Sequence, residues 1–472
     1  MVSVSKSVLY LLSKRSNAKP FSFPDIIPAT MRNRKITITL LTIPVAVLVL
    51  ALLYNYPPIN DRLAWRISSW RSQIKYALNP PEEAVFVPQE QQDQVDAIVE
   101  ATMMALTPTL TLSPTPAPAS PTPTSPGPSS TPIPSHTPTI TSTPIPESIR
   151  LTGIIHEYQH WNNCGPSNLS MALSFWGWQG DQVDTEAYLK PNQRDKNVMP
   201  YEMAAYVNDE TEFNVIWRVG GDVEILKHFV AAGFPVIIEK GFEMTGFDGW
   251  MGHYEVVNGY NDAKEQFIVQ DSFIGNGVDF AIAYEELELY WRHFNYIYIV
   301  VYPPDREAEV MSILGPQADK VYNYQHAARK ASDDIFTSEG REQAFAWFNR
   351  GTNLVYLDDY TGAAAAYDEY FAIYASLTNS EKYIPWRMMW YQTGPYWAYF
   401  YTGRYYDVLG LATTTIVAAS EPAIEESWYW RALAKETLGD ISGAIEDLQE
   451  AVKLNDNFDI GWYHLERLQS GG

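Results

Sequence analysis

The chain has 472 residues, of which 46% are hydrophobic and 14% aromatic, so two or three domains with sizeable buried cores are expected. The formal net charge is −23, and residues 1–75 hold eleven Lys/Arg against two Asp, so the remainder is strongly acidic. An acidic body repels phosphate backbones, and we therefore expect no nucleic-acid partner for the folded part.

The first predicted element is a single membrane-spanning helix at residues 36–54. The stretch ITITLLTIPVAVLVLALLY carries no charge, and nineteen helical residues span about 28 Å, close to the hydrocarbon thickness of a bilayer. Seven Lys/Arg precede it and four follow it before residue 76. This bias predicts a basic cytoplasmic N-terminus at 1–35 and an extracytoplasmic location for everything after residue 54. A cleaved signal peptide and a buried core helix are the alternatives, but no small-residue cleavage site follows.

Two connecting segments come next. Residues 55–106 form a juxtamembrane region, in which 88–106 has the spacing of a short amphipathic helix. Residues 107–147 are mostly Pro, Thr, Ser and Ala, a composition that favours extended polyproline II and cannot build a core. We expect a disordered Pro/Thr/Ser-rich stalk, glycosylated or bare, that separates the membrane from a folded domain.

Residues 148–305 have the mixed pattern of an α+β domain. Helical periodicity covers 167–178 and 223–233, and a further helix begins near Pro200. Apolar, β-branched and aromatic runs predict strands at 234–240, 253–260, 266–273 and 295–302.

Residues 320–470 are predicted to be helical and repetitive. Three similar turns, LDDYTGA at 357–363, TGRYYDV at 402–408 and LGDISGA at 438–444, each follow an aromatic-rich helix and open another. The small and aromatic residues around the first and third turns resemble tetratricopeptide (TPR) repeats, in which small residues let paired helices pack closely. The resemblance implies a surface for a protein partner; a generic helical bundle is the alternative.

Cys164, the only cysteine, lies within the most informative motif, HEYQHWNNCGPSNLSMALSFWGW, which begins at His156. One cysteine cannot form an intramolecular disulfide, so outside the cytoplasm this thiol is either buried and inert or reactive. Pro166 suits the first turn of a helix. Cys164 would therefore lie at the positive end of a helix, where a thiolate is stabilised.

A thiolate nucleophile needs a base and a group that orients the base. The segment GHYEVVNGYNDAKEQFIVQDSF reads as a hairpin with its turn near 261–263. A pairing centred on residue 262 places His253 directly opposite Asp271, within side-chain reach. For the oxyanion of acyl transfer, the Cys164 backbone N–H and the Gln159 side chain are the best donors, with Asn162 and Asn163 as rivals.

Taken together, the Gln-x4-Cys-Gly-Pro block, the Gly-His strand and the strand-borne Asp resemble the papain-like cysteine peptidases related to the bacteriocin-processing, double-glycine leader peptidases. The resemblance covers about 150 residues and implies a papain-like fold. It also implies that Cys164 is the nucleophile, His253 the base and acid, Asp271 the residue that orients His253, and Gln159 an oxyanion donor.

The sequence therefore predicts a membrane-anchored, extracytoplasmic cysteine peptidase-like hydrolase that acts on a peptide or protein through a Cys-His-Asp triad. A transpeptidase or amidase would use the same residues. The alternative is an inactive peptidase-fold adaptor that binds peptides or proteins through its TPR-like repeats. No cofactor and no metal is expected, because His156 and His160, spaced i, i+4, precede the predicted helix and lack a third ligand.

Overall fold

The computed structural model describes residues 86, 88, 89 and 145–471, apart from 193, 244–248, 378–386, 420 and 421. These residues all belong to the compact unit Asp61–Gly472. The predicted span at 36–54, nearly all of the juxtamembrane region and residues 107–144 lie outside the described residues. Among the described helices, none has the length and apolar character needed to cross a membrane.

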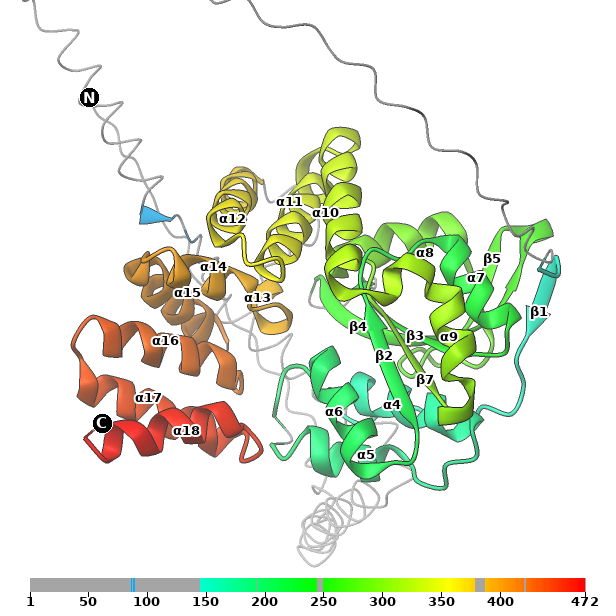
Figure 1. Cartoon of the computed structure of the whole chain (residues 1–472), viewed down its shortest axis with the longest axis horizontal. Helices are drawn as coiled ribbons and strands as arrows, with labels where there is room; N and C mark the ends of the chain where they lie inside the picture. Colours follow the sequence, from blue (N-terminus) through cyan, green and yellow to red (C-terminus); the bar gives the residue numbers. More distant parts are fainter. Residues whose placement is uncertain are drawn as a thin grey trace, which may run out of the picture. The chain divides into compact units, whose positions relative to one another are not determined.

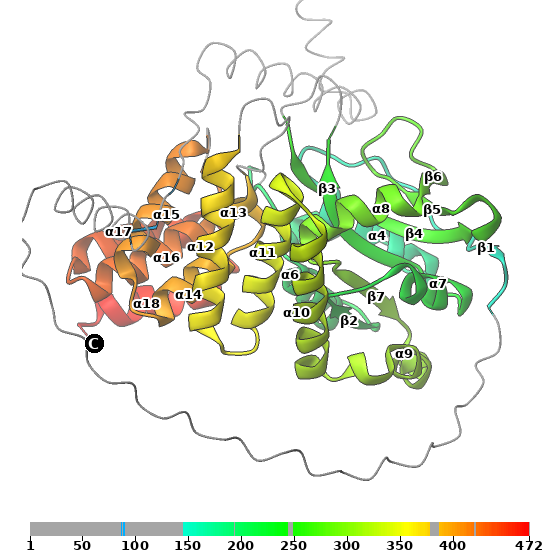
Figure 2. The same ribbon diagram turned by 90° about the horizontal axis from the view of Figure 1, so that it is seen from above.

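Seven strands form one antiparallel sheet in the order β2-β7-β3-β4-β5-β6, and β1 pairs with β4 (Figures 1 and 2). The predicted strands are confirmed as β3, β4, β5 and β7, whereas β1, β2 and β6 were not anticipated. The bounds are β1 Ser148–Arg150, β2 Asn214–Arg218, β3 Val236–Phe242, β4 Met251–Asn261, β5 Gln266–Gln270, β6 Phe280–Ala283 and β7 Tyr298–Tyr302.

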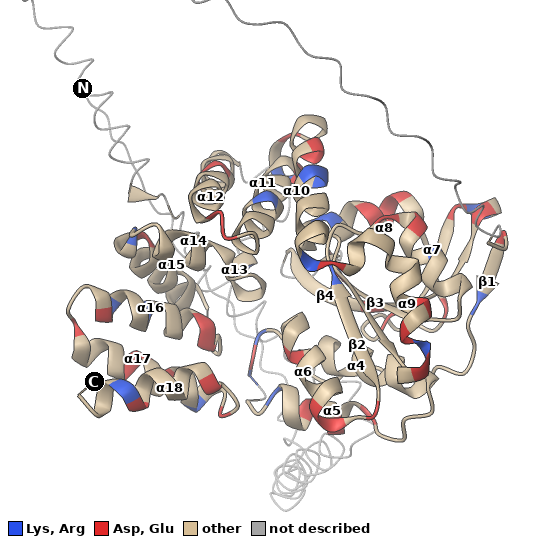
Figure 3. Ribbon diagram, viewed as in Figure 1, with Lys and Arg blue, Asp and Glu red and all other residues tan. Residues whose placement is uncertain are grey.

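Helices cover both faces of this sheet, which is why the central strands β3 and β7 are buried along their whole length. Along β3, Ile237 packs into the core formed with α4, α5 and α6, while Val236 and Ile238 pack into the core formed with α7, α8 and α9 (Figure 1). Acidic positions are marked on α5, α6 and α8 (Figure 3). The bounds are α4 Cys164–Phe175, α5 Gln182–Leu189, α6 Pro200–Glu210, α7 Val223–Ala231, α8 Tyr284–Trp291 and α9 Glu307–Leu314, with short 3-10 turns η1 Asp262–Lys264, η2 Arg292–Phe294, η3 Pro304–Arg306 and η4 Gly315–Ala318.

Two helices of this part, α5 and the predicted α7, begin at residues with clear local causes. The α5 helix opens with a capping box between Asp181 and Asp184, and α7 opens at Asp222, whose side chain accepts from the Ile225 N–H at 2.8 Å. Gly233, at φ +87°, follows the end of α7 as its sequence position suggested.

The C-terminal part is all helical, as predicted. The three repeated turns join α11 to α12, α14 to α15 and α16 to α17. Asp359 caps α12 and Asp440 caps α17, and each side chain accepts a hydrogen bond of 2.9 Å from a backbone N–H group. The helical pairs are thus confirmed, and their TPR character stays a prediction. The bounds are α10 Lys320–Thr337, α11 Gly340–Val355, α12 Tyr360–Ser376, α13 Met388–Tyr391, α14 Gly394–Tyr401, α15 Tyr405–Ala418, α16 Glu425–Thr437, α17 Ile441–Leu454 and α18 Asp459–Gln469.

The sheet-containing part and the helical part share a buried cluster. Trp250 stacks on Phe294 at a centroid distance of 5.6 Å and lies edge-to-face against Tyr391 at 5.8 Å. Asn295 and Asn353 also exchange buried side-chain hydrogen bonds of 2.7 and 3.0 Å. The helices therefore pack directly beside the strand that carries His253.

A short piece of the predicted juxtamembrane region docks on the helical part. The Phe86 ring lies 4.9 Å from the Phe371 ring, centroid to centroid, and the Gln89 N–H donates to Asp407 Oδ1 at 2.7 Å. Phe86 and Gln89, which precede the Pro-rich segment in the sequence, thus contact α12 and α15.

Candidate active site

Cys164 is the first residue of α4. Asn163 occupies the N-cap position without a side-chain cap bond, so first-turn N–H groups are left to other partners. Pro166 lies in that first turn, where a missing N–H does no harm. Cys164 is a partly exposed free thiol. The sequence-based placement of the thiol at a helix N-terminus is therefore confirmed.

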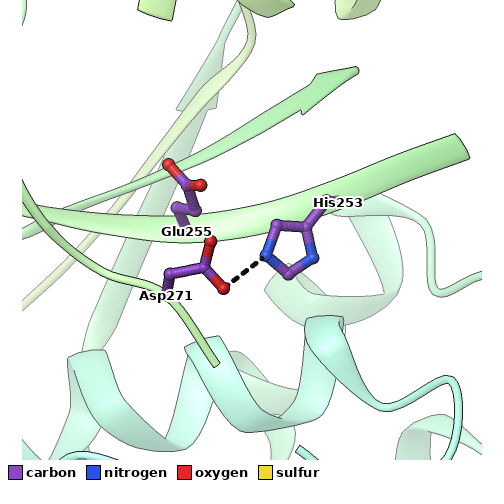
Figure 4. A group of neighbouring side chains, drawn as sticks. All are labelled: His253, Glu255 and Asp271. Carbon is purple, nitrogen blue, oxygen red and sulfur yellow. Dashed lines mark hydrogen bonds and ion pairs between the residues drawn. The ribbon is translucent and has the colours of Figure 1, made fainter. Parts of the chain in front are cut away.

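His253 and Asp271 come together as a buried pair. Nε2 of His253 lies 3.1 Å from Oδ1 of Asp271, and both side chains are almost fully buried (Figure 4). Oδ1 also accepts from the Phe273 N–H at 2.7 Å. This bond holds the carboxylate in place, and the carboxylate in turn fixes the imidazole ring with Nδ1 as its remaining nitrogen.

The strand register that motivated this pair is wrong. The hairpin pairs Tyr260 with Phe267 and Val256 with Gln270, with a bulge between Val257 and Gly259, so His253 is not opposite Asp271. The turn contains η1 and a left-handed Glu265, which moves β5 along β4. Asp271 follows the end of β5 and reaches His253 from there.

The charges at the site favour a thiolate–imidazolium pair. Burial would raise the pKa of Cys164, but a hydrogen bond and the charge of His253, with the Tyr254 backbone, lower that pKa overall. Burial acts to lower the pKa of His253, yet the Asp271 carboxylate and Cys164 raise it to about 10. Against its own burial, Asp271 has a pKa well below its ordinary value because of His253 and Lys240.

Gln159 is fixed beside the nucleophile by a chain of amide and hydroxyl bonds. Asn168 Nδ2 donates to the Tyr254 carbonyl at 2.8 Å and approaches Ser272 Oγ at 3.1 Å. Ser272 Oγ donates to Gln159 Oε1 at 2.9 Å, and the Gln159 N–H donates to the Ser272 carbonyl. Because Oε1 is the acceptor, Nε2 is the donor that Gln159 offers.

The rival amides and the two upstream histidines have other partners. Asn163 Nδ2 donates to Gln182 Oε1 at 3.1 Å, and Asn162 Nδ2 donates to the Asp195 carbonyl at 3.3 Å. His156 bonds Gln270 and His160 bonds Glu186, so the two rings are held by separate groups rather than by one site.

One cavity of about 60 Å³ brings the predicted residues together. Cys164, His253 and Gln159 all line it, and Tyr391 from α13 closes it from the helical part. A Cβ at Gly252 would stand 2.7 Å from the Phe294 ring and 2.8 Å from the Tyr391 ring. Glycine before His253 therefore lets the helical part approach β4.

A polar stripe on α5 positions the loop before Cys164, and the sequence reading missed it. Gln182 donates to the Tyr158 carbonyl at 2.8 Å, and Glu186 pairs with His160 at 3.1 Å. Lys190, 2% exposed, donates to the carbonyls of Trp161 and Asn162 at 3.1 and 2.9 Å. These three residues are spaced i, i+4, i+8, which is the signal that one helix face carries a shared role.

A second buried ion pair stands behind the His–Asp pair. Lys240 Nζ lies 2.8 Å from Glu255 Oε1, and both side chains are buried. Glu255, His253 and Asp271 each offer a ligand atom within 4.8 Å of the others (Figure 4). The Lys240 ammonium already supplies a positive charge to these three side chains. The hydrogen bond between His253 and Asp271 uses one atom of each residue. The arrangement therefore suits charge pairing among His253, Asp271, Glu255 and Lys240.

Comparison with known proteins bears on the same segment. Residues 151–299 match the family model described as "Peptidase_C39 like family". A search of the curated proteins finds no match.

Three solved structures are similar to about a third of the chain. They are a putative C39-like peptidase from Bacillus anthracis (17% identity, 33% of this chain and 96% of that chain, TM-score 0.27), a double glycine motif protease from an AMS/PCAT transporter in complex with the leader peptide (17%, 33% and 94%, 0.25), and xylellain, a cysteine protease from Xylella fastidiosa (15%, 34% and 87%, 0.26). By this family match, residues 151–299 form a peptidase C39-like domain, which a helical region follows in this chain.

Proposed function

We propose that the chain is an active cysteine peptidase that cleaves peptide bonds with Cys164, His253 and Asp271. The observation that carries the proposal is the linked set of hydrogen bonds, in which His253 joins Cys164 on one side and Asp271 on the other. The Cys164 thiol opens onto a cavity that Gln159 also lines.

The geometry supports a specific division of labour. Because Nε2 of His253 is bonded to Asp271, Nδ1 is the atom that takes the Cys164 proton. The thiolate attacks the substrate carbonyl, and the Cys164 N–H and Gln159 Nε2 donate to the oxyanion. The imidazolium then protonates the leaving amine, and the neutral ring activates the water that releases the acyl group.

The proposal includes the cellular setting read from the sequence. The uncharged stretch at 36–54, with its basic preface, supports single-pass membrane anchoring with residues 55–472 outside the cytoplasm. The helical region, with its repeated turns, supports a surface for a protein partner.

Digestion of a peptide library by the full chain tests the proposal. The wild type is expected to cleave a defined set of peptides, and Cys164→Ser is expected to cleave none. Ser170→Ala, on the same helix, is a control that leaves the nucleophile in place. A wild type that cleaves no peptide and whose thiol reacts as an ordinary cysteine would instead support the adaptor function.

A further inference from the structure

A second cavity, of about 250 Å³, adjoins the catalytic cavity. Tyr391 lines both, and Met199, which lines the second, follows Val198, which lines the first. The walls of the second cavity are rich in aromatic rings from both parts of the chain: Tyr201, Trp217, Tyr356, Tyr360 and Trp397. A peptide held at Cys164 thus has an aromatic pocket within reach of one of its side chains.

Glu239 on β3 contributes a carboxyl group to the lining of this aromatic pocket. Its side chain lines the cavity, yet the residue is only 3% exposed. Oε1 of Glu239 has no hydrogen-bond partner among the described residues. Tyr254 bonds the carboxyl group, and the Tyr254 hydroxyl itself lies 2.9 Å from the Val198 carbonyl. A buried carboxyl oxygen without a partner is costly unless something that binds there satisfies it.

The neighbouring acid on the next strand shows what Glu239 lacks. Glu255 has the Lys240 ammonium at 2.8 Å, whereas no Lys, Arg or His is among the described residues that line the second cavity. Asp358, an exposed residue, adds a second carboxylate to that lining. The cavity therefore offers carboxyl groups at two points of an aromatic lining, a combination that suits a cation.

The protonation of Glu239 fits this description. Burial raises the pKa of Glu239 well above its ordinary value; the Tyr254 hydrogen bond opposes this rise and the Cys164 charge adds to it. None of these influences is a cation. A bound guanidinium or ammonium would therefore ionise Glu239 and displace its proton.

We propose that this cavity is a specificity subsite that receives an arginine or lysine side chain of the peptide substrate, with Glu239 as the group that recognises the cation. The substrate class rests on the proposed peptidase function. The pocket itself can be tested without catalysis, because binding to a Cys164→Ala chain needs no turnover.

The test uses two sets of synthetic hexapeptides, with arginine or its neutral analogue citrulline fixed at each position in turn. Binding to the full-length Cys164→Ala chain is followed by tryptophan fluorescence, since Trp217 and Trp397 line the pocket. At one position the arginine set is expected to bind at least about tenfold more tightly than the citrulline set, as a buried charge-assisted bond predicts. This preference should grow as the pH rises and Glu239 ionises.

Two variants on the Cys164→Ala background separate recognition from folding. Glu239→Gln, which mimics the neutral acid in shape, is expected to remove the arginine preference, while Glu446→Gln, the same change at an exposed residue of α17, should keep it. Equal binding of the two peptide sets at every position, or an arginine preference that survives Glu239→Gln, would overturn the proposal. Should the wild type cleave no peptide while the binding preference persists, the peptidase function fails and the pocket stands.

Discussion

Nε2 of His253 lies 3.1 Å from Oδ1 of Asp271, and Cys164 hydrogen-bonds the same imidazole. The ring is therefore held at Nε2 by a carboxylate, which leaves Nδ1 for the thiol. In this buried arrangement the lowered pKa of Cys164 and the raised pKa of His253 favour a negative sulfur and a positive ring beside the Asp271 carboxylate. Each charge supports the next, so changes at one member should be felt at the others.

Asp271→Asn should lower kcat/KM roughly 10³-fold, because an amide neither stabilises the imidazolium nor enforces its orientation. The steady-state rate on a cleaved peptide measures the effect. Asp305→Asn, at an exposed residue of η3, is the matched control and should retain the wild-type rate. Wild-type activity in Asp271→Asn would show that the carboxylate has no role in the reaction.

The pH dependence of kcat/KM should be a bell with a broad plateau. The lowered pKa of Cys164 sets the acid limb, since the rate falls as the pH drops below it and the thiolate is protonated. The pKa of His253, raised to about 10, sets the alkaline limb, since the imidazolium loses its proton above that pH. A rate that climbs steadily up to pH 9, as an unassisted thiol would give, contradicts the ion pair.

Lys240→Met should destabilise the fold by about 3–5 kcal/mol, because it leaves Glu255 as an uncompensated buried acid beside Asp271. Burial chiefly raises the pKa of Glu255, to about 7 even with Lys240 lowering it. The double variant Lys240→Met/Glu255→Gln should recover part of the loss. Urea denaturation of the three proteins checks this, and a single variant as stable as the wild type would mean that the pair does not stabilise the fold.

Gly252→Ala should impair both stability and activity, since the new Cβ would stand 2.7 Å from the Phe294 ring and 2.8 Å from the Tyr391 ring. Overpacking of this kind costs about 1–3 kcal/mol. Gly275→Ala is the matched control, because a Cβ there meets nothing within 4 Å. Thermal melting measures the change in stability, and peptide cleavage measures the change in activity. If Gly252→Ala and Gly275→Ala melt and cleave alike, the Phe294 and Tyr391 rings move aside without cost.

Lys190→Met should shift the pH midpoint of Cys164 reactivity upward. Lys190 holds the carbonyls of Trp161 and Asn162, and its charge helps to lower the pKa of Cys164. Losing both effects makes the thiolate less favourable. Arg194→Met supplies a control that removes a positive charge from the same loop region; if both variants shift the midpoint equally, the effect is one of net charge rather than of these contacts.

Local patterns were enough to predict the elements that carry the candidate site. The Cys-Gly-Pro sequence and the apolar period after it predict a helix that starts at the thiol, and α4 begins at Cys164. Alternating and continuous apolar runs predict β3, β4, β5 and β7, since β3, β4 and β7 contribute to the cores on both faces of the sheet and β5 contributes to the core formed with α7, α8 and α9. Gln159, Cys164, His253 and Asp271 were all named from the sequence, and the first three line one cavity.

Features that depend on tertiary contacts were beyond the sequence. The bulge between Val257 and Gly259 changes the register without altering the apolar pattern of either strand. Lys240 and Glu255 read as ordinary strand residues until the sheet places them together. Tyr391 lines the cavity at Cys164 although it lies 138 residues after His253 in the sequence, and only packing between the two parts of the chain brings it there.

The central claim is that Cys164 and His253 form a thiolate–imidazolium pair, and the rate of alkylation by iodoacetamide tests it most directly. Cys164 is the only cysteine, so labelling of the full chain reports this thiol alone. We predict rapid alkylation at pH 6 in the wild type and a large loss of that rate in His253→Ala. Slow alkylation with a midpoint near the ordinary thiol value of about 8.5, unchanged by His253→Ala, would contradict the account.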